Sequence, residues 1–99
     1  MKAKTLDQSF KNILNDLFLM FIKKHKDYGK GNILSVGELG IVMRETEKIE
    51  RLKNLILKNQ NATNESIDET WTDIAVYAIL AKLVRSGDFE KLEVDKKLL

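Results

Sequence analysis

Apolar residues recur at helical spacing along most of this 99-residue chain. Between Leu6 and Ile22 they return every three or four residues, which predicts a helix over about residues 5–26. The sequence DYGKGN at residues 27–32 then interrupts the pattern with two glycines. Residues 33–40 are ambiguous, because each glycine in them weakens a helix by up to about 1 kcal/mol. They fit a short helical turn that leads into the next element.

Two more helices follow. The apolar spacing over residues 39–58 predicts the second helix, and a polar loop follows at residues 59–64. Ser66 and Glu69 form a capping-box pattern that opens a third helix, which runs to about residue 85 and stops at Gly87.

No strand or hairpin pattern competes with this helical spacing. We therefore predict an all-α fold, an antiparallel bundle of three main helices. Residues 1–87 form the single domain. Residues 88–99 alternate charged residues with leucine and valine, and they are either a short docking helix or a frayed tail.

The composition excludes several classes of protein. Hydrophobic residues make up 43% of the chain and charged residues 32%, with a net charge of +2, which is typical of a globular domain and gives no strong field for nucleic acid. The absence of cysteine excludes disulfides and thiolate zinc sites, and the single histidine argues against a His-rich metal centre. Without a membrane-length apolar run or a signal sequence, we expect a cytoplasmic protein. The small core expected at this length favours a homo-oligomer.

Two carboxylates lie within apolar faces of the predicted helices. Asp73 is the only acid between Thr70 and Val84, a stretch that is apolar almost all round. An ionised carboxylate there needs an ion pair, hydrogen bonds or a metal, because isolated burial is very costly. It either pairs with a basic residue on a neighbouring helix or belongs to a ligand site. Glu45 lies within the apolar stripe of the second helix and likewise calls for a partner.

The second helix also carries an acidic pair and a basic stripe. Glu47 and Glu50 share one face, and Arg44, Lys48 and Arg51 follow each other at a spacing of three or four. One interpretation is a solvated surface with salt bridges. The other is a site in which acids hold a hard cation such as Mg²⁺ and the basic residues hold phosphate.

The turn after the first helix offers further candidates. Its glycines permit a close approach to a ligand, Tyr28 could stack on a nucleobase, and lysines could meet phosphate. The alternative is an ordinary interhelical turn with His25 on the surface. The candidate nucleotide-binding residues in this turn are Lys26, Asp27, Tyr28, Lys30 and Asn32.

The ordered set DYGKGN, RETEKIERLKNL and ESIDETWTDIAVYAI resembles a family of phage and bacterial proteins, the first of the nucleotide-modification-associated domains. The resemblance covers about residues 21–80. That family is itself similar to the all-α nucleoside triphosphate pyrophosphatases of the MazG and dimeric dUTPase type. The positions that carry the resemblance are Asp27, Tyr28, Gly29, Arg44, Glu47, Lys48, Arg51, Glu65, Glu69, Thr70 and Asp73.

The resemblance implies a cytoplasmic protein of a bacterial host cell that binds a nucleotide and assembles as a dimer or tetramer. It implies catalytic roles for Glu47, Glu50 and Asp73, which with Glu69 would hold Mg²⁺ during cleavage of a nucleoside triphosphate to monophosphate and pyrophosphate. In this chain Thr46 interrupts the acidic run and Lys48 adds a cation to it. A non-catalytic nucleotide binder and a helical interaction module therefore remain as alternatives.

Overall fold

The computed structural model describes residues 2–58 and 67–99, and over these residues its regular elements are all helices. The chain forms α1 (Leu6–Tyr28), α2 (Gly31–Leu57), α3 (Ile67–Ser86), α4 (Asp88–Lys91) and a 3₁₀ turn, η1 (Lys96–Leu98). This confirms the predicted all-α class. No helix among the described residues is both long and apolar enough to cross a membrane. The predicted polar loop and the Ser66 end of the predicted capping box lie outside the described residues.

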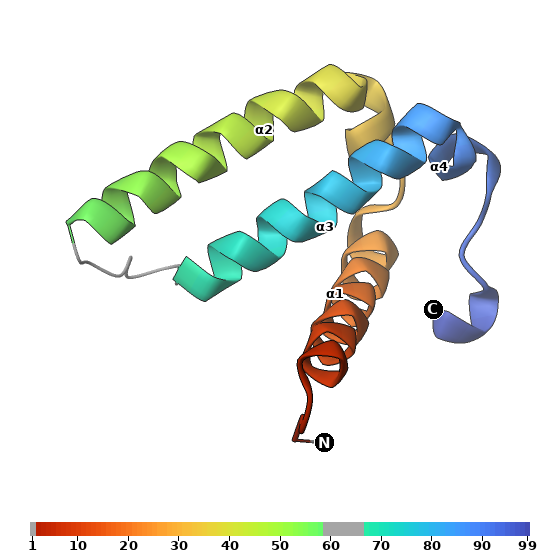
Figure 1. Cartoon of the computed structure of the whole chain (residues 1–99). Coiled ribbons are helices and arrows are strands. Elements are labelled where there is room, and N and C mark those ends of the chain that lie inside the picture. The colour runs from red at the N-terminus through yellow and green to blue at the C-terminus, as the bar shows by residue number, and fades with distance from the viewer. Residues whose placement is uncertain (1, 59–66) are drawn as a thin grey trace.

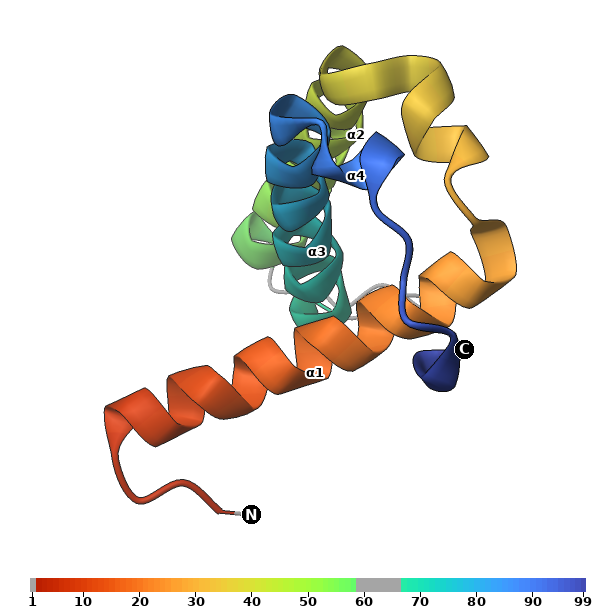
Figure 2. The same ribbon diagram turned by 90° about the vertical axis from the view of Figure 1, so that its right-hand side faces the viewer.

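The three long helices pack together, but α1 has a different direction from the other two. Helices α2 and α3 run side by side and antiparallel, while α1 crosses α3 (Figure 1). Figure 2 shows that the first half of α1 stands apart from the other helices, whereas its second half lies close to the start of α2 and to the C-terminal segment. The antiparallel arrangement therefore applies to α2 and α3, and α1 lies across them.

A small apolar core forms where the helices meet. Ile41 of α2, only 1% exposed, packs with Val76 and Leu80 of α3 and with Leu17 of α1. Phe89 of α4 is part of the same cluster. Because this side chain is only 6% exposed, residues 88–91 dock as a short helix.

Lys30 holds the end of α4 and the segment that follows it. Its ammonium donates to the carbonyl oxygens of Glu90 (3.1 Å) and Leu92 (2.7 Å) and to Glu93 Oε1 (2.8 Å). These bonds link the turn after α1 to residues about sixty positions later in the chain. The C-terminal segment is thereby held beside the end of α1.

Helix α2 is broken at Gly37, where φ is +65° and ψ is −163°. Such backbone angles are open almost only to glycine. The break separates a short first part from the long part that packs on α3, and the bend is visible in Figure 2. Residues 33–40, which the sequence left ambiguous, are thus helical on both sides of a non-helical residue.

Replacing Gly37 with alanine is expected to lower the free energy of unfolding by about 1–3 kcal/mol, because alanine is strained at this φ. An added Cβ would meet no atom within 4 Å, so the loss would come from the backbone alone. Urea denaturation measures it. Gly31→Ala is the matched control, since Gly31 also has open space but no positive φ. Equal effects of the two substitutions would contradict this explanation.

Candidate functional site

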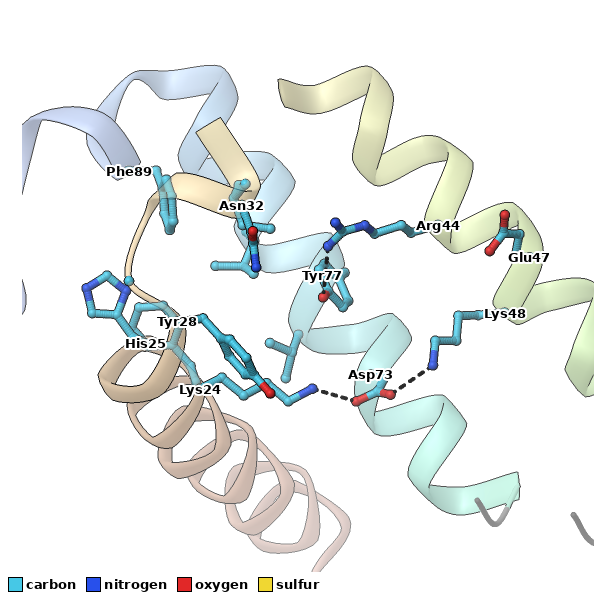
Figure 3. Close-up of a pocket in the computed structure, with 15 residues that line it drawn as sticks. Lys24, His25, Tyr28, Asn32, Arg44, Glu47, Lys48, Asp73, Tyr77 and Phe89 are labelled. Atoms are coloured by element: carbon cyan, nitrogen blue, oxygen red, sulfur yellow. Dashed lines mark hydrogen bonds and ion pairs between the residues drawn. The ribbon is translucent and has the colours of Figure 1, made fainter. Parts of the chain in front are cut away.

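A cavity of about 430 Å³ lies where α1, α2, α3 and α4 meet (Figure 3). This volume is within the range of small-molecule sites, about 300–1,000 Å³. Charged side chains from three helices and aromatic rings both contribute to its walls. Its lining residues are Phe21, Lys24, His25, Tyr28, Gly29, Asn32, Ile33, Arg44, Glu47, Lys48, Asp73, Val76, Tyr77, Leu80 and Phe89.

Asp73 joins the three long helices through one carboxylate. Its Oδ1 lies 3.0 Å from Lys24 Nζ of α1, and its Oδ2 lies 3.1 Å from Lys48 Nζ of α2 (Figure 3). Burial raises the pKa of Asp73, but the hydrogen bonds and positive charges of Lys24 and Lys48 outweigh burial, so the pKa is lowered. The expectation that this carboxylate needs a partner is confirmed, with two partners on two different helices.

Arg44 is bound differently from the two lysines. Its Nη1 donates to the Tyr77 hydroxyl at 3.2 Å, and its guanidinium lies 5.7 Å from the centre of the Tyr77 ring. Within the described residues no carboxylate lies at ion-pair distance from Arg44. Counting the described residues, the cavity wall thus holds three cations against two acids, Asp73 and the exposed Glu47, and this excess of positive charge favours an anionic ligand.

Aromatic side chains form another part of the wall. Tyr28 is 67% exposed and lines the cavity from the end of α1 (Figure 3). His25 is half-buried between the rings of Phe21 (5.5 Å) and Phe89 (6.3 Å between centroids). The interpretation of His25 as a surface residue is therefore corrected. The exposed face of Tyr28 is suited to stacking against a planar ring.

The structure brings half of the predicted site residues together around the cavity. Those that line it are Tyr28, Asn32, Arg44, Glu47, Lys48 and Asp73. Those that do not line it are Lys26, Asp27, Lys30, Glu50, Arg51 and Glu69. Lys30 instead binds the C-terminal segment.

Three polar residues of the cavity, Lys24, His25 and Tyr77, are not among the candidate site residues, although Lys24 is one of the lysines around Tyr28. Lys24 lies one turn before Tyr28 on α1, and Tyr77 lies one turn after Asp73 on α3. The four-residue spacing that places residues on one helical face could have identified both. No sequence pattern of this kind indicated that Phe89 of α4 lines the cavity.

The expected magnesium ligands do not form a metal site in this arrangement. Among the residues described, no three His, Asp or Glu side chains cluster so that they could hold a metal ion. Glu47 and Asp73 line the cavity, but Glu50 and Glu69 do not. Both oxygens of Asp73 accept hydrogen bonds from ammonium groups, which would repel a divalent cation. The donor set therefore does not fit a resident Mg²⁺.

Glu45 lies close enough to Asp73 and Lys48 for both charges to act on its carboxyl group. Its Oε1 is buried and has no hydrogen-bond partner among the described residues, so the expected partner is missing at this atom. Burial, together with the negative charge of Asp73, raises the pKa of Glu45, and Lys48 opposes the shift. The folded chain thus disfavours the ionised form of Glu45.

Glu45→Gln is expected to raise the free energy of unfolding at pH 7, by up to about 1 kcal/mol. A carboxyl group whose pKa is raised on folding stabilises the fold fully below its unfolded pKa, and this contribution is lost as pH rises through the folded pKa. The gain of the variant should therefore vanish near the unfolded value of 4.5. Urea denaturation at both pH values tests this. The matched control is Glu50→Gln, at an exposed position of the same helix. A gain that persists at low pH would contradict the explanation.

Comparison with known proteins gives no relative for this chain. No protein-family model, no curated protein and no solved structure matches it. The charges and rings that line the cavity are therefore the main indication of its function.

Proposed function

We propose that this protein binds a phosphorylated nucleoside in the cavity between its helices. The observation that carries the proposal is the position of Arg44, whose charge faces no carboxylate partner among the described residues, in a cavity wall shared with Lys24 and Lys48. A nucleotide is also the ligand class that the sequence resemblance implies.

The basic groups are suited to phosphate in two ways. The planar guanidinium of Arg44 offers parallel N–H donors that match two phosphate oxygens. The ammonium groups of Lys24 and Lys48 are already held at the cavity by Asp73, so little side-chain freedom is lost when an anion arrives. A phosphate would therefore lie on the Arg44 side of the Asp73 carboxylate.

The aromatic part of the wall is suited to the nucleobase. The Tyr28 ring is accessible, and stacking of a base on an aromatic side chain contributes about 1–3 kcal/mol. Tyr28 and Arg44 line the same cavity from α1 and α2. One ligand with a planar ring and an anionic group could therefore contact both residues.

The hydrogen bonding of Asp73 favours binding without hydrolysis. Cleavage by metal-activated water needs acids that are free to coordinate the ion. Here Lys24 and Lys48 occupy both oxygens of the central acid. We therefore propose a protein that sequesters or senses its nucleotide.

The test is a thermal-shift panel of nucleoside mono-, di- and triphosphates, unphosphorylated nucleosides and inorganic phosphate, each with and without Mg²⁺. At a hundred times Kd, a bound nucleotide stabilises the fold by about 2.7 kcal/mol. For a chain of this length that corresponds to a rise in Tm on the order of 10 °C. We expect this rise for phosphorylated nucleosides, a small or absent one for nucleosides, and no requirement for Mg²⁺.

Two other results would overturn the proposal. Release of pyrophosphate from a triphosphate in the presence of Mg²⁺, lost in Glu47→Gln, would make the protein a pyrophosphohydrolase. The absence of a shift with every compound would leave the helical interaction module as the function.

A further inference from the structure

The first half of α1 carries a stripe of uncovered apolar side chains. We define the α1 stripe as Leu6, Phe10, Ile13, Leu14 and Phe18, whose exposed fractions are 86%, 65%, 57%, 45% and 47%. At 100° per residue these positions share one broad face of the helix. In Figure 2 this half of α1 stands apart from α2 and α3.

An apolar groove continues from the stripe. It has a volume of about 220 Å³, lies between α1 and α3, and shares Leu14 and Phe18 with the α1 stripe. In the part of the chain that the structure describes, no charged side chain lines it. Its lining residues are Leu14, Leu17, Phe18, Phe21, Val76, Ile79, Leu80 and Leu83. Stripe and groove together make one continuous apolar surface.

The chain exposes far more surface than a compact monomer of its mass. Its accessible surface is 7804 Å², against roughly 5,800 Å² for a typical monomer of this size. The radius of gyration is 15.1 Å, against about 12.6 Å for a compact domain of this length. A standard protein interface buries about 800 Å² on each partner, and an obligate homodimer buries more. The excess of about 2,000 Å² is thus enough for a stable dimer interface.

We propose that the α1 stripe and the groove are the interface of a homodimer, in which α1 of each copy lies over the groove of the other. A twofold axis uses the same patch on both chains, and this patch contains both a protruding helix and a groove to receive it. The 23 residues of α1 extend for about 34 Å, long enough to reach across α3 of a second copy.

The charges beside the stripe favour a protein partner over a membrane. Helices that lie on membranes are typically rich in lysine and arginine on their polar face. Residues 6–20 instead contain Asp7, Asp16 and a single lysine, Lys11. The stripe therefore lacks the basic flanks that would attract an anionic lipid surface.

Sedimentation of the full chain at concentrations from about 1 to 100 µM tests the proposal without any nucleotide. We expect a dimer for the wild type. Phe10→Asp should weaken dimerisation at least tenfold with unchanged helicity by circular dichroism, because Phe10 is exposed in the monomer. Leu6→Asp should do the same, and it cannot weaken the helix because an acid is favourable in the first turn. Met43→Asp, at a 60% exposed position of α2, is the control and should stay dimeric.

Two results would overturn the proposal. One is a wild-type monomer throughout this concentration range; if that monomer also sediments with vesicles of anionic phospholipid, the stripe is a membrane contact. The other is a dimer that Met43→Asp dissociates and Phe10→Asp does not, which would place the interface on α2. Since none of these measurements involves nucleotide, failure here is distinct from failure of the proposed function.

Discussion

Arg44→Ala is expected to weaken nucleotide binding about ten- to a hundredfold while the fold is retained. A hydrogen bond to a charged group contributes about 1.5–3 kcal/mol, and each 1.4 kcal/mol is a factor of ten in Kd. The loss should be specific to phosphorylated ligands, because the guanidinium is the group proposed to meet the phosphate. Isothermal titration calorimetry with the best nucleotide of the panel would measure it.

Two further variants separate the geometry of Arg44 from its charge. Arg44→Lys keeps the charge but loses the planar pair of donors, so it should bind with intermediate affinity. Lys53→Ala removes a cation from an exposed position of the same helix, outside the cavity, and should bind as the wild type does. Wild-type affinity in Arg44→Ala would show that phosphate does not bind on this wall.

Ile41→Ala is expected to lower the free energy of unfolding by about 3 kcal/mol. The side chain is 1% exposed and lies in the core cluster with Val76 and Leu80, so its truncation removes buried apolar surface and leaves a cavity. In a chain of this length the loss corresponds to a fall in Tm of more than about 10 °C. Urea denaturation at a fixed protein concentration measures it, because the stability of a dimer depends on concentration.

The neighbouring residue provides the control for this experiment. Val42 is 51% exposed on the same helix, and Val42→Ala should change the free energy of unfolding by no more than about 0.5 kcal/mol. Similar losses for the two variants would contradict the packing of α2 described above.

Much of the fold could be predicted from the sequence because helical periodicity is a local signal. The predicted first helix differs from α1 by two residues at its end, and the third helix ends within one residue of Ser86. The direction of α1 could not be predicted in this way. Its apolar face is wide enough to pack at several angles, and the crossing with α3 depends on contacts such as that of Leu17 with the core. The break at Gly37 was visible only as an ambiguity, since glycine permits a non-helical angle without requiring it.

In the candidate site, too, local requirements could be predicted from the sequence, whereas tertiary contacts could not. Asp73 was identified because a carboxylate in an apolar helix needs partners, and this physical requirement holds whatever the tertiary arrangement. Which lysines would satisfy it could not be read from the sequence. Helix α1 continues to Tyr28, so Lys24, one turn earlier, lies at the cavity with it, while Lys26 is directed elsewhere. Lys30 instead binds the carbonyl oxygens of Glu90 and Leu92, about sixty residues later in the chain. No local sequence pattern indicates this contact.

The bonds made by Lys30 have a consequence for sequence change in the C-terminal segment. Two of its three acceptors are main-chain carbonyls, of Glu90 and Leu92, and every amino acid supplies such an oxygen. Side chains at these two positions can therefore be exchanged without removing the acceptors, whereas the donor must remain a long, flexible cation. The path of the segment thus depends on one residue at a distant turn, while the side chains at positions 90 and 92 are free to diverge.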